Sequence, residues 1–320
     1  MPSLLPIYDC LPALKDALTS HNEAVLEAPP GAGKISVVPI ALLSEPWLAD
    51  QKILLLEPRR VAAKLAATRL ADNLNESLGE TVGYRIRLES KVSIKTRIEV
   101  ITEGVLTRLL QNDPSLDGVG LIIFDEFHER SLDADLGLAL SIYGRELFRE
   151  TLPLKLLVMS ATLDGNAIAK LIGSKETPAP IISSEGRQFP IRYHYSVKRP
   201  DIGFALEQAV ADTIEIALQK HTESILVFLP GQREIRHVIK NISAFIHHYP
   251  DTILTPLYGN LSLSQQQEAI SPPPEGKRKI VLATAIAETS VTIQGVSIVI
   301  DSGLSRLPKY DTRTGLTRLY

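Results

Sequence analysis

The stretch EAPPGAGKIS, residues 27–36, lies between a short apolar run and a segment with helical periodicity. Gly31 and Gly33 are followed by Lys34, an arrangement in which backbone N–H groups and a helix N-terminus can surround phosphate oxygens. Against the full pattern G-x-x-x-x-G-K-[ST], Ala28 replaces the first glycine and Ile35 replaces the hydroxyl residue. The stretch predicts a phosphate-binding turn made by Pro30, Gly31, Ala32, Gly33, Lys34 and Ser36. The alternative is a glycine-rich turn with a surface lysine.

On both sides of this turn, short apolar runs rich in β-branched residues alternate with helical patterns, which is typical of parallel strands joined by crossover helices. In the first half we expect strands at 24–28, 52–57, 97–101, 121–125 and 155–160, and helices at 36–43, 61–74, 104–111 and 132–147. The alternation resumes with strands at 225–229, 252–257, 279–284 and 297–301, and helices near 203–220, 234–247 and 264–270. The pattern predicts an α/β protein with two tandem parallel-sheet domains.

The boundary between these domains is expected where prolines and a glycine interrupt the alternation, between residues 177 and 190. We place the first domain at 1–180, a linker at 181–196 and the second domain at 197–320. Near the end of the chain, Asp311 to Gly315 reads as a hairpin turn in a locally basic segment.

Composition limits the classes of function. The chain has 320 residues, 44% of them hydrophobic, and a formal net charge of -3, so a site for a polyanion must be a local feature. Its single cysteine, Cys10, excludes an internal disulfide framework. The sequence shows neither a basic leader nor an apolar run long enough for a membrane span. We expect a cytoplasmic protein with no membrane association, and the sequence implies no oligomer.

A second group of polar residues follows the strongly apolar run LIIF, residues 121–124. Asp125 at such a strand end can hold Mg²⁺, and its neighbour Glu126 can act as the general base that orients an attacking water. The alternative is a plain strand end that leads into a helix N-terminus, where Glu129 and Ser131 are favoured. The combination of the Gly-Lys turn with this acidic pair, about ninety residues later, favours nucleotide binding.

Further motifs follow one another in a fixed order along the chain. They are Glu57-Pro58-Arg59-Arg60, Thr102-Glu103-Gly104, Asp125-Glu126-Phe127-His128-Glu129-Arg130, Ser160-Ala161-Thr162, Phe228-Leu229-Pro230-Gly231, Pro256-Leu257-Tyr258-Gly259 and the run 283–290, ATAIAETS. This series resembles the DEAH-box helicases, and Phe127 within the box is similar to the bacterial HrpB group of that family. The resemblance implies two tandem RecA-like P-loop domains, ATP and Mg²⁺ as cofactors, and hydrolysis coupled to translocation on single-stranded nucleic acid, with RNA favoured over DNA.

The resemblance also implies roles for individual residues. Asp125 would serve Mg²⁺, Glu126 the attacking water, and His128 would join the residues that couple nucleotide state to domain movement, Ser160, Thr162, Glu288 and Ser290. Contacts with nucleic acid would come from Arg59, Arg60, Thr102, Gly104 and Thr284. On the residues alone, the two arginines can equally be solvated charges, and Ser160-Ala161-Thr162 can be a tight turn.

Three departures from the family pattern bear on activity. Ile35 cannot ligate Mg²⁺, and Ser36 is no obvious substitute because one step along a helix rotates the side chain by about 100°. Ala285 stands where the family commonly has asparagine. The chain ends at Tyr320, before the arginine-rich motif that the resemblance places next, so the second domain is expected to be incomplete. We expect the chain to retain nucleotide binding but to hydrolyse the nucleotide inefficiently.

Two other functions compete with a helicase motor. A non-catalytic module that binds nucleotide or nucleic acid is favoured by Ile35 and by the missing arginines. A small-molecule P-loop kinase has little support, because a second sheet with a motif at Thr284 provides no obvious acceptor pocket.

Overall fold

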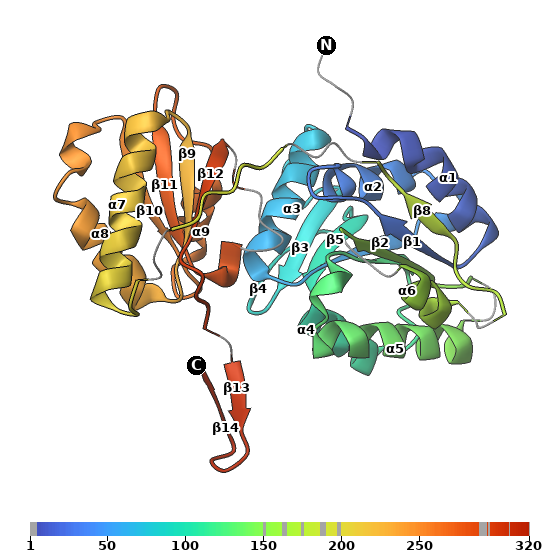
Figure 1. Ribbon diagram of the computed structural model, residues 1–320. Helices are drawn as coiled ribbons and strands as arrows, with labels where there is room; N and C mark the ends of the chain where they lie inside the picture. Colours follow the sequence, from blue (N-terminus) through green and yellow to red (C-terminus); the bar gives the residue numbers. More distant parts are fainter. Residues whose placement is uncertain are drawn as a thin grey trace. The chain divides into compact units, whose positions relative to one another are not determined.

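The computed structural model describes residues 5–149, 152–161, 165–173, 176–185, 190–196, 200–287, 293, 295–306 and 308–319 (Figure 1). The chain forms two compact units, residues 1–191 and 192–320, and each has its own sheet. Within the part of the chain described, no helix combines the length and apolar character needed to cross a membrane.

The sheet of the first unit has the strand order β4-β3-β5-β2-β6-β7-β1-β8. Strands β3 and β4 pair antiparallel, and the other neighbouring strands pair in parallel. The strands are β1 Glu23–Glu27, β2 Lys52–Glu57, β3 Val82–Ile86, β4 Glu89–Lys91, β5 Ile98–Thr102, β6 Val119–Phe124, β7 Lys155–Ser160 and β8 Ile181–Ser183. Because the central strands are parallel, their carboxyl ends share one edge of the sheet.

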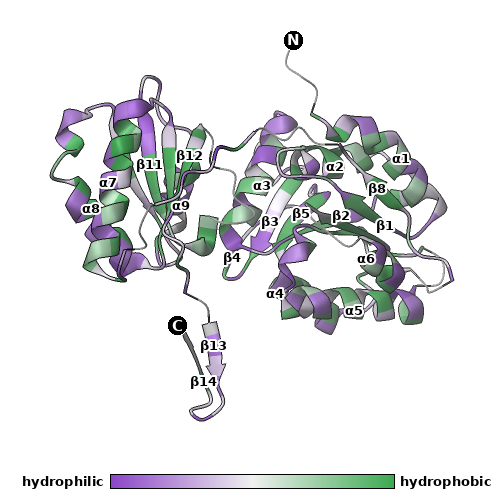
Figure 2. Ribbon diagram, in the orientation of Figure 1, coloured by the Kyte–Doolittle hydropathy of each residue, from purple (hydrophilic) through white to green (hydrophobic). Residues whose placement is uncertain are grey.

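Helices cover this sheet because its central strands are apolar on both faces. Every residue of β6 and β7 is buried, and β1 and β2 are coloured as hydrophobic in Figure 2. One core cluster joins strand residues such as Leu54, Ile122 and Val158 to Leu106 and Leu138 of two covering helices. The helices are α1 Ile7–Ser20, α2 Lys34–Leu42, α3 Arg60–Asn73, α4 Glu103–Asn112, α5 Leu132–Phe148 and α6 Gly165–Ile172, with short 3₁₀ turns η1 Pro46–Leu48 and η2 Phe127–Glu129.

The second unit has a parallel sheet with the order β10-β11-β9-β12 and a separate antiparallel hairpin, β13-β14. Its helices are α7 Phe204–Lys220, α8 Gln232–Ile242 and α9 Leu263–Ile270, with 3₁₀ turns η3 Ile246–His248 and η4 Ala285–Ala287. Its strands are β9 Ser224–Phe228, β10 Thr252–Leu257, β11 Arg278–Ala283, β12 Val296–Asp301, β13 Pro308–Asp311 and β14 Leu316–Leu319. The hairpin turns at residues 311–315, as predicted.

The structure corrects the sequence-based expectations at three places. The segment 177–190, predicted as a loop, contributes the edge strand β8, which pairs with β1; the loop prediction was wrong for Ile181–Ser183. At the other edge, β3 and β4 were not predicted, and β4 pairs antiparallel with β3 in a sheet that is otherwise parallel, as expected. Helix α1 was not predicted, although Ile7, Leu14 and Leu18 bury one face of it at helical spacing.

Candidate nucleotide-binding and catalytic site

The predicted phosphate-binding turn connects β1 to α2. Gly31 has φ 79° and Gly33, the residue before the first turn of α2, has φ 96°. Both values lie in the left-handed region that side chains other than glycine rarely adopt. A Cβ atom at Gly31 would meet no heavy atom within 4 Å, so this peptide faces open space. The turn therefore leaves room beside the N-terminus of α2, where an anion is stabilised by backbone N–H groups and by the helix dipole.

Lys34 points from the start of α2 toward the acidic pair that follows β6. Its Nζ lies 3.6 Å from Oε1 of Glu126 and 3.9 Å from Oδ1 of Asp125. Among the described residues, the Lys34 ammonium and both carboxylate oxygens of Asp125 have no hydrogen-bond partner, although both side chains are buried. Buried polar groups are normally paired, so these atoms fit a site whose partners are phosphate oxygens and a hydrated cation.

The sheet order explains why these residues meet. Strands β2, β6, β7 and β1 are consecutive neighbours and run in parallel, so their carboxyl ends lie along one edge. The Ala28 N–H donates to the Ser160 carbonyl at 2.9 Å, which fixes the start of the phosphate turn against the end of β7. Asp125 N–H donates to the Leu56 carbonyl at 3.2 Å, which fixes the acidic pair beside β2. Residues far apart in sequence thus gather at one place.

Glu57, at the end of β2, belongs to the same acidic cluster. The residue is 1% exposed, and among the described residues neither of its carboxylate oxygens has a hydrogen-bond partner. Burial, reinforced by the negative charges of Asp125 and Glu126, raises the pKa of Glu57 well above its usual range. Burial likewise raises the pKa of Asp125 to about 7, even though the charge of Lys34 acts to lower it. Without a cation to balance their negative charge, the Glu57 and Asp125 carboxyl groups therefore keep their protons to a higher pH than exposed carboxyl groups do.

Sequence reasoning assigned Glu57 no role, although a signal was present. The residue ends the continuous apolar run KILLLE, which is the same position in a strand that singled out Asp125.

His128 connects the acidic pair to the end of β7. Its Nδ1 lies 3.3 Å from Oε2 of Glu126 and 3.3 Å from Oγ of Ser160. Glu126 itself adopts a left-handed conformation with φ 47°, which turns the chain sharply at the strand end. The structure thus brings together His128, Ser160 and Glu126, three of the predicted catalytic and coupling residues. Thr162, Glu288 and Ser290 lie outside the described residues.

Ile35 and Ser36 occupy the first turn of α2, where the family pattern has its hydroxyl ligand. The Ser36 hydroxyl donates to the Gly33 carbonyl at 3.2 Å and is therefore engaged within its own helix. We expect any contact of Ser36 with phosphate to use its backbone N–H. In the described part of the chain, no group of three or more His, Cys, Asp or Glu side chains is arranged to hold a metal ion. A cation here would depend on Asp125, on phosphate oxygens and on water.

The predicted nucleic-acid contacts in the first unit lie at the ends of β2 and β5, two paired strands in which Glu57 is opposite Thr102. Arg59 lies 3.6 Å from a carboxylate oxygen of Glu129, while Arg60 is exposed at the start of α3. Thr102 precedes α4, and Gly104 is exposed in its first turn. Thr284 lies in the second unit at the end of β11, where its N–H donates to the Leu257 carbonyl.

Comparisons with known proteins identify the family of the chain. The family described as DEAD/DEAH box helicase matches residues 11–171, and the helicase conserved C-terminal domain matches residues 207–314. The chain is 48% identical over 317 residues to the ATP-dependent RNA helicase HrpB of Escherichia coli (strain K12), covering 99% of this chain and 38% of that protein. It is 36% identical over 320 residues to the ATP-dependent RNA helicase DHX33 of Mus musculus, covering 98% of this chain and 45% of the relative.

The fold is also similar to that of a solved relative. The crystal structure of the Escherichia coli DEAH/RHA helicase HrpB is similar with a TM-score of 0.87 at 48% identity, over 98% of this chain and 39% of that one. The chain thus spans 38–45% of the length of these relatives.

Proposed function

Because the chain belongs to the DEAD/DEAH box helicase family and has two tandem RecA-like helicase domains, we propose that it is part of an ATP-driven nucleic-acid motor. In this proposal the carboxyl edge of the first sheet binds ATP with Mg²⁺, and hydrolysis drives movement along single-stranded nucleic acid, RNA in preference to DNA. The names of the relatives, both ATP-dependent RNA helicases, support the choice of RNA.

One observation carries the proposal. The buried Lys34 ammonium and the buried Asp125 carboxylate lack hydrogen-bond partners among the described residues, and they lie beside a glycine turn that faces open space. Leaving such groups buried without a hydrogen bond costs about 1–3 kcal/mol each, and more when they are charged. A triphosphate with its cation supplies a partner to each of them.

The chain's own residues would divide the chemistry. The N–H groups of residues 31–34 and the Lys34 ammonium bind phosphate oxygens. Asp125 would hold a hydrated cation, which would supply neutralisation of charge on the transferring phosphoryl group. Glu126, oriented by His128, orients the attacking water and accepts its proton. Lys34 Nζ lies 3.6 Å from Oε1 of Glu126 in this structure, so engagement of Lys34 with phosphate would draw the ammonium away from Glu126 and leave that carboxylate free to face the attacking water.

A second function is favoured by one specific observation. Ile35 replaces the hydroxyl ligand, and the Ser36 hydroxyl is engaged with Gly33. Loss of this ligand affects the metal more than the phosphates, since the phosphates are bound mainly by backbone N–H groups and Lys34. A chain that binds nucleotide without efficient turnover is therefore the alternative.

The test is the ATPase rate of the 320-residue chain with and without single-stranded RNA, beside Glu126→Gln and Lys34→Ala variants. We expect slow turnover that RNA stimulates, nucleotide binding without turnover in Glu126→Gln, and loss of nucleotide binding in Lys34→Ala. Nucleotide binding with no turnover above that of Glu126→Gln would establish the binding module instead. A chain that binds neither ATP nor single-stranded RNA over a range of salt concentrations would contradict both functions.

A further inference from the structure

Helix α5 is apolar on two faces, and only one of them is covered by the first unit. Its inner face packs on the sheet side through buried residues that include Ala134, Leu138 and Ser141. At 100° per residue, a second set lies within an arc of about 80° on the opposite face. We call this set the outer stripe: Leu132, Leu136, Leu140, Tyr143 and Leu147. A helix that is apolar on both sides is normally covered on both sides.

The outer stripe is strongly exposed. Leu132 is 84% exposed, Tyr143 65% and Leu147 67%, while Leu136 is 42% exposed and Leu140 is half-buried. Single exposed apolar side chains are common on protein surfaces, but a contiguous row of large ones marks an interaction surface. The row runs along most of α5, whose 17 residues extend about 25 Å.

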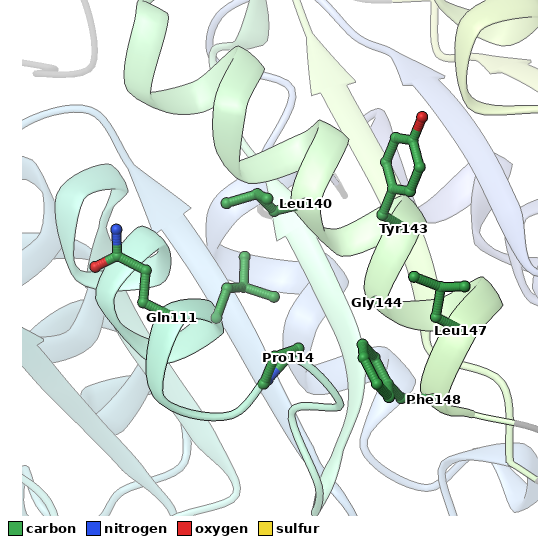
Figure 3. Close-up of a pocket in the computed structure, with 8 residues that line it drawn as sticks. Gln111, Pro114, Leu140, Tyr143, Gly144, Leu147 and Phe148 are labelled. Atoms are coloured by element: carbon green, nitrogen blue, oxygen red, sulfur yellow. The ribbon is translucent and has the colours of Figure 1, made fainter.

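At its C-terminal end the outer stripe enters a pocket of about 340 Å³ between α4 and α5. Figure 3 shows the side chains around it. The lining residues are Leu110, Gln111, Pro114, Leu140, Tyr143, Gly144, Leu147 and Phe148. Gly144 allows the backbone at Pro114 to approach α5 closely, because a Cβ atom at position 144 would collide with the Pro114 carbonyl oxygen. The pocket is lined mainly by apolar groups and has the size to take one or two large apolar side chains.

Within α5, the charged residues that flank the outer stripe are acidic. By the same helical geometry, Asp133 lies along one side of the stripe, and Asp135 and Glu146 lie along the other. Asp135 is partly neutralised by Arg130, whereas Asp133 and Glu146 are exposed. The basic residue in the last turn of α5, Arg145, lies on the inner side, where its Nη1 is 2.8 Å from Oε2 of Glu23. An apolar surface with acidic flanks selects a partner with basic flanks.

We propose that the outer stripe and its pocket form a docking surface for an amphipathic α-helix of a partner protein, with apolar anchors on one face and lysine or arginine on both flanks. A second copy of this chain is disfavoured, because an antiparallel pair of α5 helices brings like flanks together and would place the acidic residues of both copies on the same side. Acidic flanks also disfavour anionic membranes and nucleic acid. The groove between two helices suits a helix that inserts side chains at i, i+3 or i+4, and i+7.

The test uses two synthetic 18-residue helical peptides with identical apolar positions at that spacing, one with lysine flanks and one with glutamate flanks. Binding to the 320-residue chain is measured by fluorescence anisotropy at two salt concentrations. We expect the lysine peptide to bind at least tenfold more tightly than the glutamate peptide, and less tightly at the higher salt. Leu147→Asp should weaken it at least tenfold, while Ile94→Asp, at a fully exposed site outside the stripe, should not.

A charge-reversed variant, Asp133→Lys with Glu146→Lys, should invert the preference between the two peptides. Circular dichroism checks that each variant folds. No binding of the lysine peptide, equal binding of both peptides, or full binding by Leu147→Asp would each overturn the proposal. A dimer in light scattering that Leu147→Asp dissociates would overturn it in favour of a second copy.

Discussion

Replacing Asp125 by asparagine should stabilise the nucleotide-free protein at alkaline pH. The Asp125 carboxyl is buried, and its pKa is raised from an ordinary 3.8 to about 7. Because the folded chain holds this proton more tightly than the unfolded chain does, ionisation of Asp125 lowers stability as pH rises from about 4 to about 7, and the loss is complete above pH 7. At roughly 1.4 kcal/mol for each pH unit, the loss is about 4 kcal/mol. Asparagine has no such ionisation.

This value is an upper limit for Asp125→Asn, because the variant also removes a negative charge that Lys34 faces at 3.9 Å. Glu126 remains 3.6 Å from the same ammonium, so we expect a gain of about 2–4 kcal/mol at pH 8 that is absent at pH 4. Nucleotide hydrolysis should be lost at the same time, since Asp125 is the proposed cation ligand.

Urea unfolding in EDTA measures the effect, followed by the fluorescence of Trp47, the chain's single tryptophan, which lies in the first unit. With a slope of about 1–3 kcal/mol per molar urea, the midpoint at pH 8 should rise by about 1 M or more. A variant that is no more stable than the parent at pH 8, or equally stabilised at pH 4 and pH 8, would refute the account of the buried carboxylate.

Three further predictions concern the edges of the site. Ile35→Thr should raise nucleotide affinity several-fold in Mg²⁺ but not in EDTA, since it restores one oxygen ligand; equal affinities with and without the metal would show that the hydroxyl is irrelevant here. Glu27→Ala should speed amide exchange in α6, because Oε1 of Glu27 accepts from the Gly165 N–H at 3.2 Å at the start of that helix; unchanged exchange would remove this link. Ser131→Ala should lower the free energy of unfolding by about 1 kcal/mol, because the Ser131 hydroxyl accepts from the Ala134 N–H at 2.9 Å as the N-cap of α5, and urea unfolding at pH 7 checks it.

The fold could be predicted where a single local rule decided each element. The run KILLLE became β2 with the predicted bounds, and KLLVMS became β7, because strands buried on both faces must be apolar throughout. The edges of the first sheet were harder. The residues of β4 are glutamate, serine and lysine, which carry no apolar pattern, and β8 has three residues, of which one is buried. Their pairing is decided by neighbouring strands, which a local pattern does not contain.

The residues of the candidate site likewise fall into two groups, those that a local sequence pattern identifies and those that depend on the folded arrangement. Rules for strand ends and glycine turns identified Lys34 and Asp125, and the structure places their side chains within 4 Å of each other. The hydrogen bond of the Ser36 hydroxyl depends on the rotamer of one side chain, so no sequence pattern could give it. Glu57 was missed although it ends an apolar strand, because only the strand order β2-β6 shows that it lies beside Asp125.

Charge decides how severely Ile35 affects the proposed metal site. The hydroxyl that Ile35 replaces is neutral, so its loss removes one oxygen atom and no charge. The attraction for a divalent cation would come from the acidic side chains of Asp125, Glu126 and Glu57, which outnumber the single positive charge of Lys34. A cation in this cluster would lower the pKa of the Asp125 and Glu57 carboxyl groups, which burial raises, so its binding would release protons. Metal affinity should therefore rise steeply with pH in this chain, and the isoleucine should weaken it without abolishing it.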